Sequence, residues 1–271
     1  MHAPRLAPCI ALLTSLAACD FGGATAAELR MAVDESVATG QAEAVQQDII
    51  EISTSFTLGD AVQTAIAELQ AFIAAESACA VVTADGDHGV TIDFGDLADD
   101  CTYKGRHYAG VLHISVELKD DSTVVTHTAT GFSNGALTLD GTAVVTWTAD
   151  SRHVVTDLTF DREGRVTTVE GDRTQRLLDA DAGLAGGIVV DGTRDWSNDR
   201  GEFALGIEDV EMRPVDPVPQ AGTYELTLPS GNTASLVFTR IDADTIEVRV
   251  DGPRRDRVYH VTSTGAVAEQ D

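Results

Sequence analysis

The sequence lacks an apolar run long enough to stay in a membrane as a helix. A membrane-spanning helix needs about 20 consecutive apolar residues. The run from Cys9 to Ala18 is much shorter, and no other stretch approaches that length without charges. We therefore expect a body that no helix threads through a membrane.

Basic side chains are also scarce. The chain has 18 Lys and Arg against 44 Asp and Glu, a formal net charge of −26, and its only lysines are Lys104 and Lys119. A body this acidic repels nucleic acids and anionic lipid headgroups at close range. The charge therefore argues against a nucleic-acid partner. It also keeps an exported protein soluble.

The first 18 residues differ from the rest. Arg5 is their only charged side chain, and an apolar run follows it and ends in Leu16-Ala17-Ala18-Cys19. A positive start, a short apolar core and a small-residue end are typical of a secretory signal peptide. The last four residues resemble the lipobox of bacterial lipoproteins, which implies cleavage after Ala18 and a diacylglyceryl group on the Cys19 sulfur. The alternative is a secreted protein with a chance cysteine beside its cleavage site.

The lipobox resemblance implies a location in the cell envelope. A lipidated Cys19 carries at least two acyl chains, enough for a stable anchor, so the body would face the periplasm or the cell exterior. Asp20 resembles the inner-membrane retention signal of enterobacterial lipoproteins, but not all bacteria follow that rule, and both membranes stay open. Removal of residues 1–18 leaves 253 residues with 17 basic and 44 acidic side chains, a net charge of −27.

The four cysteines divide into two groups. Cys9 leaves with the signal peptide and Cys19 takes the lipid. Cys79 and Cys101 would remain in an oxidising compartment, where such a pair tends to form a disulfide. Closing that loop stabilises a fold by about 3 kcal/mol in the chain-entropy model. Two free thiols or half of a metal site are the alternative, but no CxxC or Cys/His spacing supports them.

The N-terminal part of the body has helical spacing. Residues 19–27 are small and weakly patterned, as in a flexible tether. From 28 to 53, apolar residues recur at three- and four-residue steps, which predicts a helix that Gly40 is expected to break in two. A second stripe predicts another helix over 57–76. Residues 28–78 are therefore predicted to form a helix pair.

The rest of the body is predicted to be mainly β. Strand-like runs alternate with turns over 79–212, and Tyr108–Leu118 alternates most clearly between apolar and polar residues. Short connections predict an antiparallel meander. Residues 213–221 hold three of the seven prolines, as in a linker, and 222–271 are expected to form a small β unit. The predicted class is α+β, with the helix pair packed on a curved sheet.

A pattern of turns and cysteines runs through the body. Its members are Cys79, Val90-Thr91-Ile92-Asp93-Phe94-Gly95, Cys101, Gly105-Arg106, Gly110 and Asp140-Gly141-Thr142. The pattern covers about residues 57–145 and resembles a group of predicted bacterial lipoproteins of unknown function. It implies a fold and no activity. Asp140-Gly141-Thr142 also recurs as Asp191-Gly192-Thr193, which a duplicated hairpin or chance would explain equally well.

One motif could carry catalysis. Residues 131–135 fit the G-x-S-x-G spelling of a hydrolase nucleophile elbow, with Ser133 as the nucleophile. That elbow needs a helix after the serine, whereas a strand-like run follows here. Asn134-Gly135 instead favours a β-hairpin, in which both residues supply positive φ angles and Ser133 faces water. A hydrolase is therefore the third choice of function.

Metal and cofactor motifs are lacking as well. The carboxylates of the loops near the cysteines lack EF-hand spacing and are expected to be solvated turn residues: Asp85, Asp87, Asp96, Asp99 and Asp100. With a two-residue turn between their strands, His113 and His127 point to opposite faces of the sheet and are expected at the surface. We predict no metal and no cofactor.

These patterns favour a lipoprotein with a non-catalytic role, either in binding a partner or in structure. The alternative is a carrier that holds a lipid or another apolar ligand between the curved sheet and the covering helices. A carrier needs a large apolar cavity under the helices, whereas a binding module has a filled core.

Overall fold

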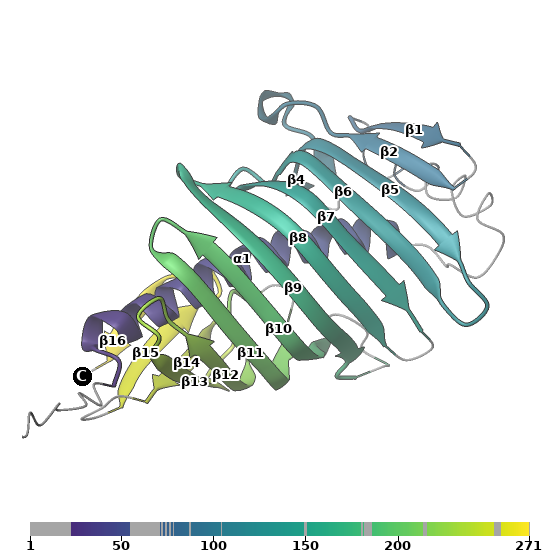
Figure 1. Ribbon diagram of the computed structural model, residues 1–271. Coiled ribbons are helices and arrows are strands. Elements are labelled where there is room, and N and C mark those ends of the chain that lie inside the picture. Colours follow the sequence, from purple (N-terminus) through teal and green to yellow (C-terminus); the bar gives the residue numbers. More distant parts are fainter. Residues whose placement is uncertain are drawn as a thin grey trace, which may run out of the picture.

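The computed structural model describes residues 23–54 and 71–270, apart from 72, 74, 76, 78, 87, 104, 149–150, 180, 182–185, 214–215 and 252–255 (Figure 1). The helices of these parts are α1 (Ala26–Thr54) and the short 3-10 helix η1 (Leu97–Asp99). The first strands are β1 (Val81–Asp85), β2 (Gly89–Asp93), β3 (Thr102–Tyr103), β4 (Arg106–His107), β5 (Ala109–Leu118), β6 (Thr123–Ser133), β7 (Thr138–Trp147) and β8 (Arg152–Arg162). The others are β9 (Arg165–Leu177), β10 (Ile188–Asn198), β11 (Gly201–Met212), β12 (Ala221–Thr227), β13 (Thr233–Arg240), β14 (Thr245–Val250), β15 (Arg257–Thr262) and β16 (Val267–Gln270).

Fourteen of these strands form one sheet. Its order is β1-β2-β5-β6-β7-β8-β9-β10-β11-β12-β13-β14-β15-β16, and β3 and β4 pair separately. Every pair of neighbours is antiparallel, as in β8 and β9, so the prediction of a mainly antiparallel fold is confirmed. Strands β12–β16, expected as a small β unit, continue the same sheet.

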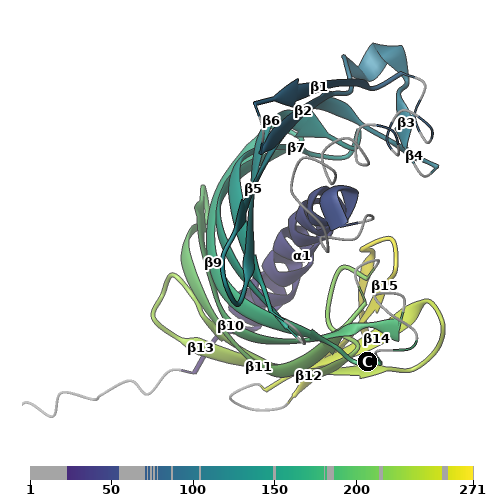
Figure 2. The ribbon, with the colours of Figure 1, turned by 90° about the vertical axis from the view of Figure 1, so that its right-hand side faces the viewer.

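The sheet curls around α1 (Figure 2). In β8, the buried Arg152, Val154, Thr156, Leu158 and Phe160 alternate with exposed or half-buried residues. This alternation puts one set of side chains on the concave face and the other in solvent. Every residue of α1 from Leu29 to Ile52 is buried or half-buried, since the sheet surrounds most of the helix.

Helix α1 begins with a capping box. The Thr25 N–H donates to the Glu28 carboxylate at 2.7 Å, and the Glu28 N–H donates to the Thr25 hydroxyl at 3.3 Å. This reciprocal pair satisfies N–H groups that have no partner within a helix. Hydrogen bonds from Ser230 and from Thr25 lower the pKa of Glu28 to about 2. The cap therefore also joins the helix to the β12–β13 turn.

The prediction of a helix pair is not supported. Among the described residues α1 is the single long helix, and the second predicted helix, residues 57–76, lies mostly outside them. The expected break at Gly40 is wrong, because α1 runs through this residue without interruption. Position 40 has no room for a side chain, because a Cβ there would lie 1.9 Å from the Pro217 carbonyl oxygen.

The proline-rich residues before β12 pack against the rest of the body. Asp216 and Val218 are both 2% exposed. The Asp216 carboxylate accepts hydrogen bonds from Arg213 at 2.9 Å and from Arg240 of β13. Together with the contact at Gly40, these bonds hold this segment against the helix and the sheet.

The repeated Asp-Gly-Thr tripeptides have the same local role. The Asp140 carboxylate accepts the backbone N–H of Gly131 at 2.7 Å, and the Asp191 carboxylate accepts that of Asp209 at 2.7 Å. Gly131 and Asp209 have φ angles of 55° and 46° and lie in irregular parts of their strands. Each Asp thus stabilises a β-bulge in a neighbouring strand. The bulge precedes the tripeptide in one case and follows it in the other, so the two hairpins are not simple copies.

Replacement of Gly40 tests the contact between helix and loop. Alanine gains about 1 kcal/mol over glycine in a helix, but overpacking against a carbonyl group costs about 1–3 kcal/mol. We expect Gly40→Ala to lower the melting temperature by several degrees. The control Ala38→Gly, at a half-buried position of the same helix, should lose only the propensity difference. A higher melting temperature for Gly40→Ala would contradict the close approach to Pro217.

Candidate functional site: a polar cleft beside the buried helix

Helix α1 is enclosed and yet polar. A helix that is buried all round is normally hydrophobic all round. The buried polar side chains of α1 are Glu35, Ser36, Thr39, Glu43, Gln46 and Gln47. A buried charge without a partner is costly, so the concave face of the sheet must supply partners for these carboxylates.

Glu43 lies at the centre of this interface. Its two carboxylate oxygens pair with Arg173 of β9 and Arg194 of β10, both 2% exposed. Arg173 also donates to the Gln46 side chain at 3.2 Å, and the Arg194 guanidinium lies 5.8 Å from the Tyr224 ring centroid. Two buried cations thus share one carboxylate, and both depend on it for charge compensation.

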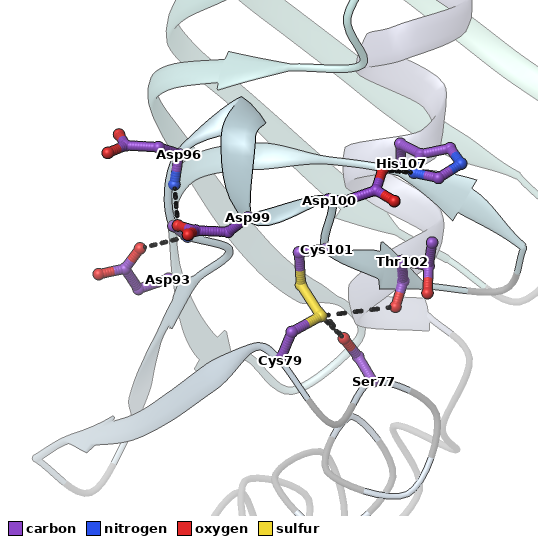
Figure 3. Close-up of a disulfide and its surroundings, with 10 residues drawn as sticks. Ser77, Cys79, Asp93, Asp96, Asp99, Asp100, Cys101, Thr102 and His107 are labelled. Carbon is purple, nitrogen blue, oxygen red and sulfur yellow. Dashed lines mark hydrogen bonds and ion pairs between the residues drawn. A yellow bond between two sulfur atoms is a disulfide. The ribbon is translucent and has the colours of Figure 1, made fainter.

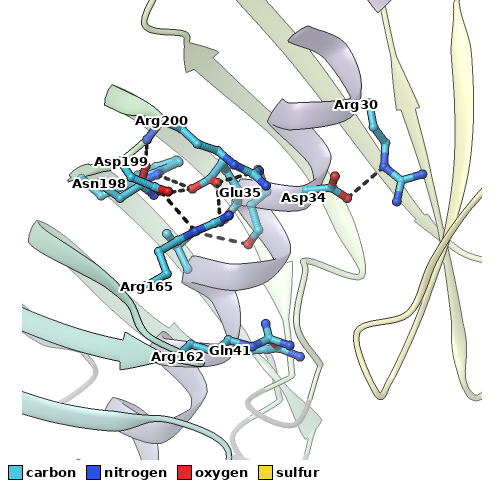
Figure 4. A network of polar contacts seen from close by, with 12 residues as sticks. Arg30, Asp34, Glu35, Gln41, Arg162, Arg165, Asn198, Asp199 and Arg200 are labelled. Atoms are coloured by element: carbon cyan, nitrogen blue, oxygen red, sulfur yellow. Dashed lines mark hydrogen bonds and ion pairs between the residues drawn. The ribbon is translucent and has the colours of Figure 1, made fainter. Parts of the chain in front are cut away.

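Glu35 forms a second centre, nearer the start of the helix (Figure 4). Its carboxylate accepts hydrogen bonds from Trp196 Nε1 at 3.2 Å, Asn198 Nδ2 at 2.8 Å, Arg200 at 3.0 Å and Arg165 at 3.3 Å. Only 1% of Glu35 is exposed. These donors come from β9, from β10 and from the β10–β11 turn, so one helical carboxylate ties two strands and a turn together.

A third pairing lies toward the end of the helix. Arg152 of β8 donates to Glu51 at 2.8 Å and to Gln175 of β9 at 2.7 Å. Its guanidinium lies 4.9 Å from the Trp147 ring centroid. Burial lowers the pKa of Arg152, and Glu51 opposes that effect. Because a guanidinium stays protonated in proteins, Arg152 is a buried cation held by these partners.

The sequence analysis did not single out these arginines. Arg152, Arg173 and Arg194 occupy inward-facing positions of their strands, where the alternation would place an apolar residue. In β9, Thr167, Val169, Gly171, Arg173 and Gln175 form one buried set. Side chains alternate between the two faces of a strand, so the sequence of β9 alone would have placed Arg173 on the same, concave face as Val169. The partner carboxylate is far away in the sequence, so its identity could not be inferred.

The less buried stripe of α1 borders a cleft. This stripe consists of the half-buried Asp34, Ala38, Gln41, Ala44 and Asp48. A cavity of about 540 Å³ lies between the stripe, β4, the β6–β7 turn and the β15–β16 turn. A second cavity of about 330 Å³ lies beside the β8–β9 and β10–β11 turns. Both volumes are within the usual range of ligand pockets.

Arg162 lines both cavities and lies where they meet. Its guanidinium donates to the Gln41 side-chain oxygen, and Gln41 Nε2 donates in turn to the Thr264 carbonyl at 3.4 Å. Gln41 therefore links the β8–β9 hairpin to the β15–β16 turn across the cleft. Arg162 and Gln41 form a polar bridge between the two cavities.

The charge of Arg162 is not compensated nearby. Among the described residues, no carboxylate lies within 4.0 Å of its guanidinium nitrogens. The other cavity-lining arginines each have at least one: Arg106 has Asp48, Arg165 has Glu35 and Asp199, and Arg200 has Glu35. Arg162 is only half-buried, so water can reach it. Arg162 is thus a water-accessible cation that donates to Gln41 but forms no ion pair with a described carboxylate.

The far end of the larger cavity contains an ion pair. Asp48 pairs with Arg106 and accepts a hydrogen bond from Tyr108 at 3.2 Å. Burial raises the pKa of Asp48, an effect that Arg106 opposes. Burial also raises the pKa of Tyr108, so its hydroxyl keeps its proton and acts as a donor. The Asp48–Arg106 pair is therefore a polar wall with little net charge.

The two histidines of the first long hairpin lie on opposite faces, as predicted. His113 pairs with Thr128 and His127 with Ile114. The expectation that both lie at the surface is wrong for His127, which is 1% exposed on the concave face. Burial lowers the pKa of His127 to about 4, although a hydrogen bond to the Ala143 carbonyl opposes the shift. His127 is therefore a neutral core residue.

Cys79 and Cys101 form a disulfide, as the sequence predicted (Figure 3). Their sulfur atoms are 2.04 Å apart, and the bridge links residues 22 positions apart. The Ser77 hydroxyl lies 3.1 Å from the Cys79 sulfur. The bridge joins the segment before β1 to the start of β3. Cys19, the predicted lipidation site, lies outside the described residues.

The aspartates near the disulfide make local turn contacts. The Asp93 carboxylate accepts the Gly95 N–H at 2.8 Å, and the Asp99 carboxylate accepts the Asp96 N–H at 2.9 Å (Figure 3). Asp100 pairs with His107 at 2.7 Å. Within the described ranges, no group of three or more His, Cys, Asp or Glu side chains is arranged to hold a metal ion.

Ser133 is not the exposed turn residue that we expected. It is 3% exposed, its hydroxyl donates to the Leu137 carbonyl at 2.7 Å, and it accepts the Gly135 N–H at 3.1 Å. Gly135 has a φ of 85°, but Asn134 does not share a positive φ. Asn134 instead accepts the Ala136 N–H at 3.0 Å through its side chain. The loop is longer than two residues, and Ser133 closes it from inside.

Comparisons with known proteins provide no relative. No protein-family model, no curated protein and no solved structure matches this chain. In the part of the chain that the structure describes, no helix has the length and apolar character needed to cross a membrane.

Removal of the Glu43 charge tests the central ion pairs. The change Glu43→Gln keeps the shape but leaves Arg173 and Arg194 buried without a carboxylate. Breaking a buried pair in this way costs about 3–5 kcal/mol. We expect that loss in the free energy of unfolding, measured by urea denaturation. The control Glu269→Gln breaks the exposed pair with Arg257 and should cost no more than about 1 kcal/mol. Equal losses for both variants would contradict a structural role for Glu43.

Proposed function

We propose that this chain is the precursor of a lipid-anchored, extracytoplasmic lipoprotein of the bacterial cell envelope, with a non-catalytic role in binding or structure. The sequence Leu16-Ala17-Ala18-Cys19 supports the anchor, since it ends a short apolar run of the type that signal peptides have. The disulfide between Cys79 and Cys101 is consistent with an oxidising compartment.

A lipid on Cys19 would hold the body close to the membrane. Helix α1 begins at Ala26, and seven residues of extended chain span at most about 25 Å. The start of α1 and the β12–β13 turn, which are joined through Glu28 and Asn232 at 3.3 Å, would therefore lie nearest the lipid surface. The cleft runs along the helix away from this end, where it stays accessible to soluble ligands.

The filled interior of the curl is the single observation that favours binding or structure over lipid carriage. The spaces between α1 and the sheet near Glu43 measure about 10 Å³ each. One lies beside Gly40 and Ile188, and the other beside Leu158 and Val169. A space of that size holds one water molecule at most. The carrier hypothesis requires a large apolar cavity between sheet and helix, so it ranks second.

An enzyme remains the third choice. The hydroxyl proton of Ser133 is already donated to the Leu137 carbonyl at 2.7 Å, whereas a nucleophilic serine donates to a general base. A Ser133 adduct formed with a fluorophosphonate probe would promote the hydrolase over the binding role.

The anchor can be tested with two single cysteine variants of the full chain expressed in a bacterial host. The change Cys19→Ser should abolish incorporation of a radioactive fatty acid and release the body from the membrane fraction. The change Cys9→Ser, in the apolar run, should leave labelling and membrane association unchanged. Membrane association that persists in Cys19→Ser would overturn the lipoprotein proposal.

A further inference from the structure

The two cavities beside α1 share Arg162 as a lining residue, and together they are called the cleft. Arg162 lies where they meet and has no carboxylate within 4.0 Å among the described residues. Asp48 lies at the far end of the larger cavity. An anionic group in this cleft would therefore be attracted to the Arg162 end, whereas the Asp48–Arg106 pair at the other end has little net charge.

The net charge of the protein does not prevent anion binding here. The formal charge of −26 repels anions at a distance, but fields between exposed charges are largely screened beyond about 8 Å at physiological salt. Arg162 lines both cavities and, unlike Arg106, Arg165 and Arg200, it has no ion-pair partner among the described residues. Its planar fork of N–H donors matches a carboxylate, and the hydrogen bond to Gln41 holds it in place.

Eight of the thirteen residues that line the larger cavity have polar or charged side chains. Gln41, His107, Asn134, Ser263 and Thr264 offer both donors and acceptors around about 540 Å³. The apolar residues of the lining are Ala44, Val45, Ala136, Leu137 and Pro217. A lipid tail would shield these polar groups from water without forming a hydrogen bond to any of them. A ligand with many hydroxyl groups would satisfy them.

We propose that this cleft binds an acidic saccharide, with the carboxylate of a sugar acid on Arg162 and the sugar hydroxyls in the larger cavity. This assignment rests on the proposed binding role and specifies its ligand class. The cavity has room for more than one sugar ring, and the Asp48–Arg106 pair at its far end provides an acceptor and donors for the last hydroxyls.

The test uses the mature, lipid-bearing protein in detergent micelles and measures binding by titration calorimetry. The probes are glucuronate, a glucuronate disaccharide, glucose and acetate. Glucuronate and its disaccharide should bind, the disaccharide more tightly, while glucose and acetate should bind at least tenfold more weakly. Added salt should weaken binding of the acidic sugars, since a charge pair contributes to it.

Arg162→Gln should weaken glucuronate binding at least tenfold, and Arg162→Lys should restore part of it because the charge is kept. Arg249→Gln, in the exposed pair with Glu247 on β14, is the matched control and should bind like the parent. Thermal melts of all three variants show whether they are folded.

Binding that is unaffected by Arg162→Gln, or acetate binding as tight as that of glucuronate, would overturn the proposal. So would an absence of glucuronate binding. None of these results bears on the membrane anchor, which the Cys19→Ser experiment tests separately. A wrong ligand class can therefore be distinguished from a wrong lipoprotein assignment.

Discussion

The arginine–carboxylate pairs between α1 and the concave face are the interaction on which this structure depends. A helix with Glu35 and Glu43 buried would be unstable in an apolar tunnel. Arg165 and Arg200 pair with the first carboxylate, and Arg173 and Arg194 neutralise the second. Because several of these bonds require a particular rotation of the helix, they also fix the register between helix and sheet. An all-apolar interface would allow the helix to slide or turn at lower cost.

The sheet separates charge between its two faces. The concave side and its cleft hold the arginines described above, whereas the convex side is acidic. Asp157, Glu170 and Asp195 lie directly opposite one another on β8, β9 and β10, and all three are exposed. Like charges in such positions are mildly destabilising, and the pairs inside offset that cost.

The sequence predicted the parts of the fold that depend on local rules. Period-two alternation and short turns identified the antiparallel meander, and the two remaining cysteines identified the disulfide. The two-residue turn after Leu118 placed His113 and His127 on opposite faces, which the register confirms. These features follow from neighbours in the chain, so no tertiary information was needed.

Features that depend on distant partners could not be predicted. From the sequence alone, Gly40 suggested a break in the helix. A glycine is needed there because the Pro217 carbonyl approaches the helix, and Pro217 belongs to a segment far along the chain. Ser133 was expected in water because its burial depends on how the β6–β7 loop folds back. The cleft at Arg162 combines residues from α1, β8 and the β15–β16 turn, and no local pattern links them.

The claim that α1 is locked inside the curled sheet is tested most directly by native-state hydrogen exchange, resolved by residue. If buried ion pairs hold the helix, the amides of residues 33–50 will exchange only through global unfolding, as slowly as the central strands β8, β9 and β10. Exchange of these helical amides through a lower-energy opening, while the central strands stay protected, would contradict the account. It would show that the helix leaves the sheet without unfolding the body.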